Sequence, residues 1–289
     1  MTKTKSFLNY FFITIAIVLL SKISFNFLAL KFIKSVWGLE TLEIYNDLQS
    51  GKFNYVYAHK FLALFDQIGT FLLPSVIIFY FVKFNHPRFI TPKKNDYLKL
   101  LYFLIILIGI TQILVHFSTY LNNKILPESV YNYLQKQQEF NIGLQEKFVG
   151  KSFLNFTFNI FLLAVIPAIG EELFFRALIQ KIFKGIFKNY ILGIVITSLI
   201  FGLLHFQIDN LIAIIFASII FGFIYEKSEN ILLTIILHFC FNLFALINMQ
   251  AIKLEIIEEN EIYNFGNYFL IPFSVVMLIY VYKKKIFWR

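Results

Sequence analysis

The chain has 289 residues, of which 58% are hydrophobic, 19% aromatic and only 15% charged, and its mean hydropathy is +0.71. Soluble domains are about 45–50% apolar and about 25% charged, so this composition excludes a soluble globule, a disordered chain and a disulfide scaffold. A net charge of +9 is compatible with nucleic acid or with anionic lipid as a partner, and the placement of the charges decides between them.

Apolar stretches of about 20 residues are long enough to cross the hydrocarbon core of a bilayer. Eight such stretches follow one another along the chain and predict an all-α, polytopic membrane helix bundle with about eight transmembrane helices. They cover residues 7–30, 61–82, 98–120, 153–175, 189–206, 210–226, 230–249 and 266–282.

The connections between these stretches differ in character. The first stretch follows Lys3 and Lys5 and is too long for a signal peptide, so we expect it to be retained as a span. The fifth and sixth stretches form a tight hairpin around Asp209. Residues 31–60 and 121–152 are polar, and we expect them to form helices or caps on the outer side.

Basic residues gather on the side of the membrane that holds both chain ends. The inner segments hold 15 basic residues, of which 12 lie in the runs around residues 83–99, 181–188 and 283–289, whereas acidic residues concentrate on the other side. This asymmetry places both termini in the cytoplasm, in a membrane that the composition suggests is a bacterial plasma membrane. The charge is therefore a topology signal, with the lipid bilayer as neighbour and no nucleic acid.

Ionisable residues inside a membrane are costly and need a reason. Asp66 and His116 belong to no motif, and local hydrogen bonding explains them best. The other intramembrane groups cluster between residues 171 and 242 and consist of Glu171, Glu172, Arg176, His205 and His238, with Asn242 as a polar companion.

The segment Gly170–Arg176 places two adjacent carboxylates before an arginine. On an α-helix Glu172 and Arg176 share a face and form an ion pair, whereas Glu171 is turned about 100° away and lacks that partner. An unpaired carboxyl group in an apolar setting suits a general base or acid. Pro167 removes a helical hydrogen bond and is expected to kink the helix before the two acids.

Two further spans carry the remaining polar groups. His205 ends the run of residues 197–205, and His238 and Asn242 lie four residues apart on one face of a later span. An imidazole beside an amide offers two hydrogen-bond donors to a developing oxyanion. Depths counted from the inner loops allow all of these groups to meet in one intramembrane cavity.

At these residues the sequence resembles the CPBP intramembrane proteases, which include the enzymes that process CAAX-box proteins and bacterial relatives linked to bacteriocin handling. Their signature is Glu-Glu-x-x-x-Arg, then Phe-x-x-x-His, then His-x-x-x-Asn or Asp. Here it reads from Glu171 to Arg176, from Phe201 to His205 and from His238 to Asn242. Ala177 stands where the family usually has Gly.

The resemblance implies an intramembrane endopeptidase that hydrolyses a peptide bond of a membrane-associated protein or peptide. Glu171 and His205 would activate water and shuttle protons, while His238 and Asn242 would stabilise the oxyanion. Glu172 and Arg176 would hold the motif helix. On this reading residues 151–250 form the catalytic core, residues 1–150 precede it, and residues 251–289 add a final span and a basic tail.

Other interpretations stay open. The charged residues could form a structural ion network, and the fold could serve a catalytically idle immunity or scaffold protein or an ion-coupled transporter. Two histidines and a carboxylate could bind zinc, but the sequence lacks His-Glu-x-x-His, so no cofactor and no metal are expected. No recognisable prenyl-binding feature identifies the substrate.

Overall fold

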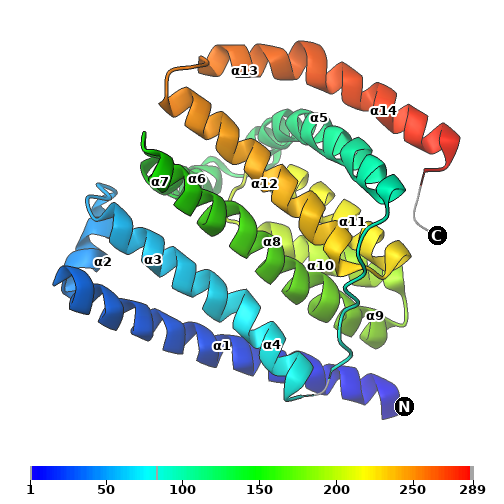
Figure 1. Ribbon diagram of the computed structural model, residues 1–289, viewed down its shortest axis with the longest axis horizontal. Helices are drawn as coiled ribbons and strands as arrows, with labels where there is room; N and C mark the ends of the chain where they lie inside the picture. Colours follow the sequence, from blue (N-terminus) through cyan, green and yellow to red (C-terminus); the bar gives the residue numbers. More distant parts are fainter. Residues whose placement is uncertain (1, 83, 287–289) are drawn as a thin grey trace.

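The computed structural model describes residues 2–82 and 84–286, and they form an all-α bundle (Figure 1). Four stretches are π-helical and carry the label η. The elements are α1 (Thr2–Trp37), α2 (Thr41–Ser50), α3 (Val56–Gln67), η1 (Ile68–Leu72), α4 (Leu73–Tyr80), α5 (Lys94–Ile125), α6 (Glu128–Phe148), α7 (Phe153–Asn159), η2 (Ile160–Val165), α8 (Ile166–Glu171), η3 (Glu172–Gln180), α9 (Lys181–Phe187), α10 (Tyr190–Leu203), α11 (Leu211–Ser228), α12 (Ile231–Lys253), α13 (Glu259–Phe265), η4 (Gly266–Leu270) and α14 (Ile271–Lys284).

Seven helical stretches of the described chain are long and apolar enough to cross a membrane, which confirms the predicted polytopic bundle. They are Ser6–Trp37, Val56–Tyr80, Lys94–Ile125, Phe153–Phe187, Leu211–Ser228, Ile231–Lys253 and Asn260–Lys284. The protein is therefore an integral, multi-pass membrane protein.

The fifth expected span differs in length from the prediction, because α10 has only 14 residues. At 1.5 Å per residue it rises about 21 Å, less than the hydrocarbon core of about 30 Å. The start of α1 and the end of α14 nevertheless lie at the same end of the bundle, as an even number of passes requires (Figure 1). Helix α10 is thus too short to cross the hydrocarbon core by itself.

Three of the four π-helical segments lie just before a proline: η1 before Pro74, η2 before Pro167 and η4 before Pro272. A proline ring clashes with the carbonyl four residues earlier in an α-helix, and a wider i to i+5 turn relieves that clash. The distortion expected before Glu171 thus takes the form of the π-helical segment η2.

Segment η3 occupies the centre of the bundle, and all nine of its residues are buried. It packs against α10, α11, α12 and α4, whereas α1 and α14 expose many large apolar side chains along their length. In a membrane protein such apolar exposure faces lipid. The segment that begins with Glu172 is therefore shielded from lipid by the surrounding helices.

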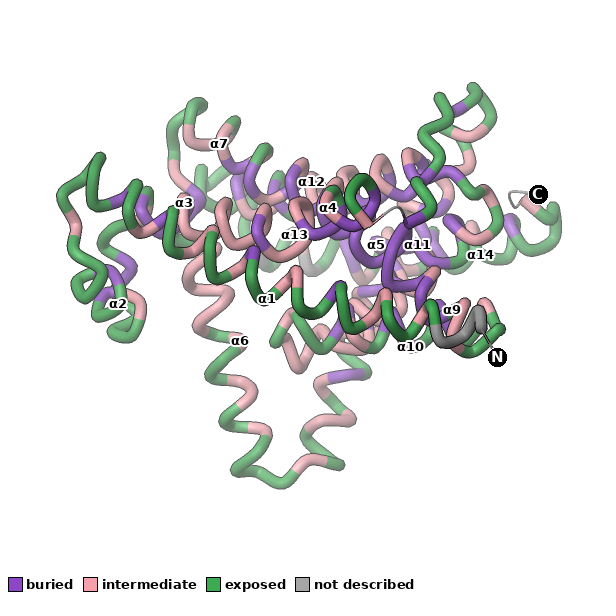
Figure 2. Tube along the Cα trace, turned by 90° about the horizontal axis from the view of Figure 1, so that it is seen from below, coloured by how far each residue is buried: buried purple, intermediate pink, exposed green. Residues whose placement is uncertain are grey.

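The two polar segments expected outside the membrane are largely helical. Residues 31–60 contain the end of α1, all of α2 and the start of α3, and residues 121–152 contain α6. Helix α6 and the end of α5 leave the bundle sideways as a two-armed projection, most of it exposed or half-buried (Figure 2). We call residues 118–148 the α5–α6 arm.

Asp66 has the local role that was expected of it. Its carboxylate lies 2.7 Å from the Lys22 ammonium of α1, and Asn26 is a further hydrogen-bond donor at 3.4 Å. The pair joins α1 to α3 and lies apart from the cluster between residues 171 and 242.

Candidate active site

The two adjacent glutamates stand at a change of helix type. Glu171 is the last residue of α8, and Glu172 is the first residue of η3. The residue spacing predicts an α-helix here, and that prediction is wrong for residues 172–180, which form a π-helix. The ion pair forms all the same, with Arg176 Nε 3.1 Å from Glu172 Oε2. Single π-helical turns often occur at functional sites, because they change the direction in which side chains project.

Arg176 is fully buried, and its planar guanidinium contacts several groups at once. Nε donates to Glu172, and Nη1 donates to the Ser218 hydroxyl of α11 at 2.9 Å. The guanidinium carbon also lies 5.0 Å from the ring centre of Phe201 and 5.6 Å from that of Phe221. These contacts fix Arg176 and, through it, the orientation of the Glu172 carboxylate.

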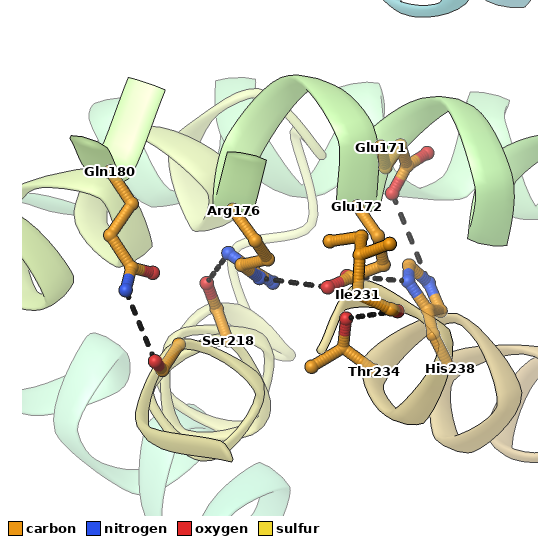
Figure 3. Close-up of polar contacts among 9 residues, drawn as sticks. Glu171, Glu172, Arg176, Gln180, Ser218, Ile231, Thr234 and His238 are labelled. Carbon is orange, nitrogen blue, oxygen red and sulfur yellow. Dashed lines mark hydrogen bonds and ion pairs between the residues drawn. The ribbon is translucent and has the colours of Figure 1, made fainter. Parts of the chain in front are cut away.

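His238 of α12 lies between the two carboxylates (Figure 3). Its Nδ1 is 3.0 Å from Glu172 Oε1, and its Nε2 is 3.9 Å from Glu171 Oε2. The Phe221 ring stacks on the imidazole with centroids 5.1 Å apart and planes 22° apart. Because Glu172 is paired with Arg176, its carboxylate accepts a hydrogen bond from Nδ1 of His238. Nε2 is thereby directed toward Glu171.

Glu171 has a neighbour that the sequence did not assign to it. The sequence left this carboxylate without a partner, whereas the fold brings His238 to it from a helix packed alongside. The separation of 3.9 Å is too long for a direct hydrogen bond. Glu171 is 6% exposed, so its carboxylate is close to, but not sealed from, the surroundings of the bundle.

His205 lies just past the end of α10 and is half-buried. Its Nδ1 is 2.6 Å from the Phe201 carbonyl oxygen. A carbonyl oxygen only accepts hydrogen bonds, so Nδ1 carries a proton and Nε2 of the neutral ring has a free lone pair. The Phe201 ring is 4.5 Å from the His205 ring and 6.3 Å from the His238 ring, centre to centre. One phenyl ring thus adjoins both histidines.

Asn242 lies one helical turn beyond His238 on α12 and is half-buried. Among the described residues its side chain has no hydrogen-bond partner. The structure therefore brings four of the predicted residues into one contact network, namely Glu171, Glu172, Arg176 and His238. It places His205 one aromatic ring away and Asn242 on the adjoining turn.

The site contains His and Glu side chains, which are residue types that can bind a metal ion. Within the described residues no group of three His, Cys, Asp or Glu side chains is arranged to hold a metal ion. Glu172 is also engaged on both oxygens by Arg176 and His238. The expectation that no metal is used stays a prediction, and chelation tests it directly.

The sequence motifs assign no role to Ser218, Phe221 or Gln180, although all three complete the surroundings of the ion pair. Gln180 donates from Nε2 to the Gly222 carbonyl at 3.1 Å, one turn from the Arg176–Ser218 contact. A signal was present, because Ser218, Phe221 and Gly222 recur at helical spacing in an otherwise apolar span. Only their contacts with η3 show what that face of α11 does.

Part of the chain matches a known protein family. Residues 153–244 match the family described as type II CAAX prenyl endopeptidase, Rce1-like. This match supports the resemblance of residues 153–244 to the CAAX protease family. Comparison with curated proteins and with solved structures gave no match.

The CAAX protease-like stretch contains the whole cluster from Glu171 to Asn242. Helices α1–α6 and segments α13–α14 lie outside it. The protein is therefore a membrane protein with a CAAX protease-like core. The additional helices at both ends are outside the region that the family match describes.

Proposed function

We propose that the protein is an intramembrane endopeptidase that cuts a membrane-associated protein or peptide by means of a water activated by Glu171 and histidine. The observation that carries the proposal is the placement of His238 between two buried carboxylates. The Glu172 carboxylate is held in the Arg176 network, whereas the Glu171 carboxylate has His238 Nε2 at 3.9 Å and accepts no hydrogen bond from the described residues. The Glu171 carboxylate is thus available to act on a bound water.

In the proposed reaction Glu171 accepts a proton from water as the water oxygen attacks the scissile carbonyl carbon. A carboxylate in a largely apolar setting is suited to this transfer. The attack converts the carbonyl oxygen into an oxyanion. With a proton on each ring nitrogen, His238 donates from Nδ1 to Glu172 and from Nε2 to that oxyanion, and Asn242 supplies a second donor.

Collapse of the tetrahedral intermediate breaks the carbon–nitrogen bond and requires a proton on the leaving amine. His205 is suited to pass the proton that Glu171 took from water to the amine, because its Nδ1 is committed to the Phe201 carbonyl and its Nε2 has no hydrogen-bond partner among the described residues. Glu172 and Arg176 act through His238 as positioning residues. No covalent intermediate is required, and water is the second substrate.

The proposal extends to the setting of the enzyme. The basic chain ends and inner loops support a cytoplasmic location for both termini in a bacterial plasma membrane. A thiol-reactive, membrane-impermeant reagent applied to single-cysteine variants in intact cells tests this orientation. Labelling in the α12–α13 connection but not after α14 is the expected pattern.

The decisive experiment compares the peptides of native membranes that contain wild-type protein, Glu171→Gln, His205→Ala or Glu139→Gln at matched expression. Glu171→Gln keeps the size of the side chain and removes the base, and Glu139→Gln makes the same change on an exposed side chain of α6. Peptides cut by wild type and by Glu139→Gln, but intact in the other two, support the proposal and identify the substrate. Equal cutting by folded Glu171→Gln contradicts it and favours a scaffold.

A further inference from the structure

The connection between α10 and α11, residues 204–210, follows a helix that is too short to cross the hydrocarbon core. It begins about 21 Å from the start of α10 and carries His205 as its second residue. Irregular backbone at membrane depth is tolerated only where protein covers it or where it lines a water-filled cavity. The connection therefore needs hydrogen-bond partners from elsewhere in the chain.

The α5–α6 arm supplies these partners from two sides. From α5, the Ser118 hydroxyl and the Asn122 amide donate to the Ile208 carbonyl at 3.1 and 2.9 Å. From α6, Gln138 accepts from the Asp209 backbone N–H at 2.9 Å and donates to the Asp209 carboxylate at 3.3 Å. The backbone of the connection is thus bound by side chains of the arm.

The carboxylate of Asp209 is the centre of this arrangement. Besides Gln138, it accepts a hydrogen bond from the Tyr131 hydroxyl at 3.2 Å and one from Asn122 at 3.4 Å. Burial and the neighbouring Asp209 charge raise the pKa of Tyr131, so the phenol stays protonated and acts as a donor. Asp209 is four residues from His205, and both lie in a short segment whose local backbone hydrogen bonds are single turns, such as that from the His205 N–H to the Gly202 carbonyl at 3.2 Å.

We infer that the α5–α6 arm is a positioning element for His205, acting through Tyr131, Gln138 and Asp209. The inference rests on the proposed function, in which His205 moves a proton. The arm lies outside residues 153–244, so this chain supports a core residue with helices that the family match does not include. Loss of the contacts releases the connection and misplaces His205 without removing any group that contacts the substrate.

Two pairs of variants on α6 test the inference. Gln138→Leu and Tyr131→Phe remove contacts with Asp209, while Gln137→Leu and Tyr133→Phe make the same changes at exposed positions of the same helix. Tyr131→Phe removes one hydroxyl only, so it is expected to fold even if Gln138→Leu does not.

The first measurement is the mobility of a spin label at residue 204, introduced as Leu204→Cys in a Cys240→Ala background. Leu204 is 49% exposed and adjoins His205, and Cys240 is the single native cysteine. Greater label mobility in Gln138→Leu and Tyr131→Phe than in their controls is expected. Unchanged mobility in both overturns the inference, whatever the activity of the protein.

The second measurement is the rate of peptide cleavage, without the spin label. A misplaced proton-transfer group lowers kcat by roughly 10–100-fold and leaves KM nearly unchanged. Normal kcat despite a mobile label, or a raised KM alone, overturns the positioning role. If wild type cuts no peptide, the proposed function fails, and the mobility result still shows separately whether the arm orders the connection.

Discussion

The Arg176–Glu172 ion pair allows the sharpest test of how the site is held together. Both side chains are fully buried, and Arg176 also binds Ser218 while Glu172 also binds His238. Replacing Arg176 by Met keeps most of the apolar volume but leaves the Glu172 charge without its cation. Breaking one partner of a buried pair costs about 3–5 kcal/mol, because an uncompensated charge remains buried.

The same reasoning applies to Glu172→Gln, which leaves the Arg176 charge with the Ser218 hydroxyl and two aromatic rings. The double variant, Glu172→Gln with Arg176→Met, leaves neither charge. Its loss of unfolding free energy should therefore be well below the sum of the two single losses, with a coupling of roughly 1–3 kcal/mol. Ser218→Ala removes one charge-assisted hydrogen bond and should cost about 1.5–3 kcal/mol.

The assay is loss of helical circular dichroism during titration of detergent-solubilised protein with a denaturing detergent. Lys253→Met is the matched control, because Lys253 is an exposed cation at the end of α12. Additive losses in the double variant, or an Arg176→Met protein as stable as Lys253→Met, would refute the view that the buried pair is mutually dependent.

Three further outcomes are expected. Gly109→Ala places a methyl group 2.6 Å from the Leu270 carbonyl oxygen, so it should lower the free energy of unfolding by about 1–3 kcal/mol in the same titration. Gly143→Ala is the control and should be nearly neutral, because the nearest neighbour of its added methyl group is 3.7 Å away. Hydrogen bonds from His59 and from backbone N–H groups outweigh the opposing effect of burial and hold the pKa of Asp47 below its usual value. The stability that Asp47 contributes is thus present above pH of about 4 and is lost as the pH falls through the lowered pKa. Asp47→Asn should flatten the acid limb of a pH–stability curve, and an unchanged limb would contradict this assignment. Incubation with a zinc chelator should leave cleavage intact, and inhibition that added zinc reverses would instead establish a metal enzyme.

The sequence determined the class of the protein and the chemistry available to it. Apolar stretches of membrane-spanning length follow directly from the order of residues, because each helix satisfies its own backbone within the bilayer. The Glu172–Arg176 pair was also predictable, since residues four apart remain neighbours even when the helix widens into η3. The spacing of residues along one helix is enough to predict such a pair.

The tertiary structure decided which groups meet. Glu172 and His238 are 66 residues apart in the chain, and Asp209 and Tyr131 are 78 apart. Their contacts depend on how helices pack, because no local rule relates the rotation of one helix to that of another. The same holds for the early end of α10, which the apolar run continuing past Leu203 did not predict. Its connection is stable there because side chains of the α5–α6 arm satisfy its backbone.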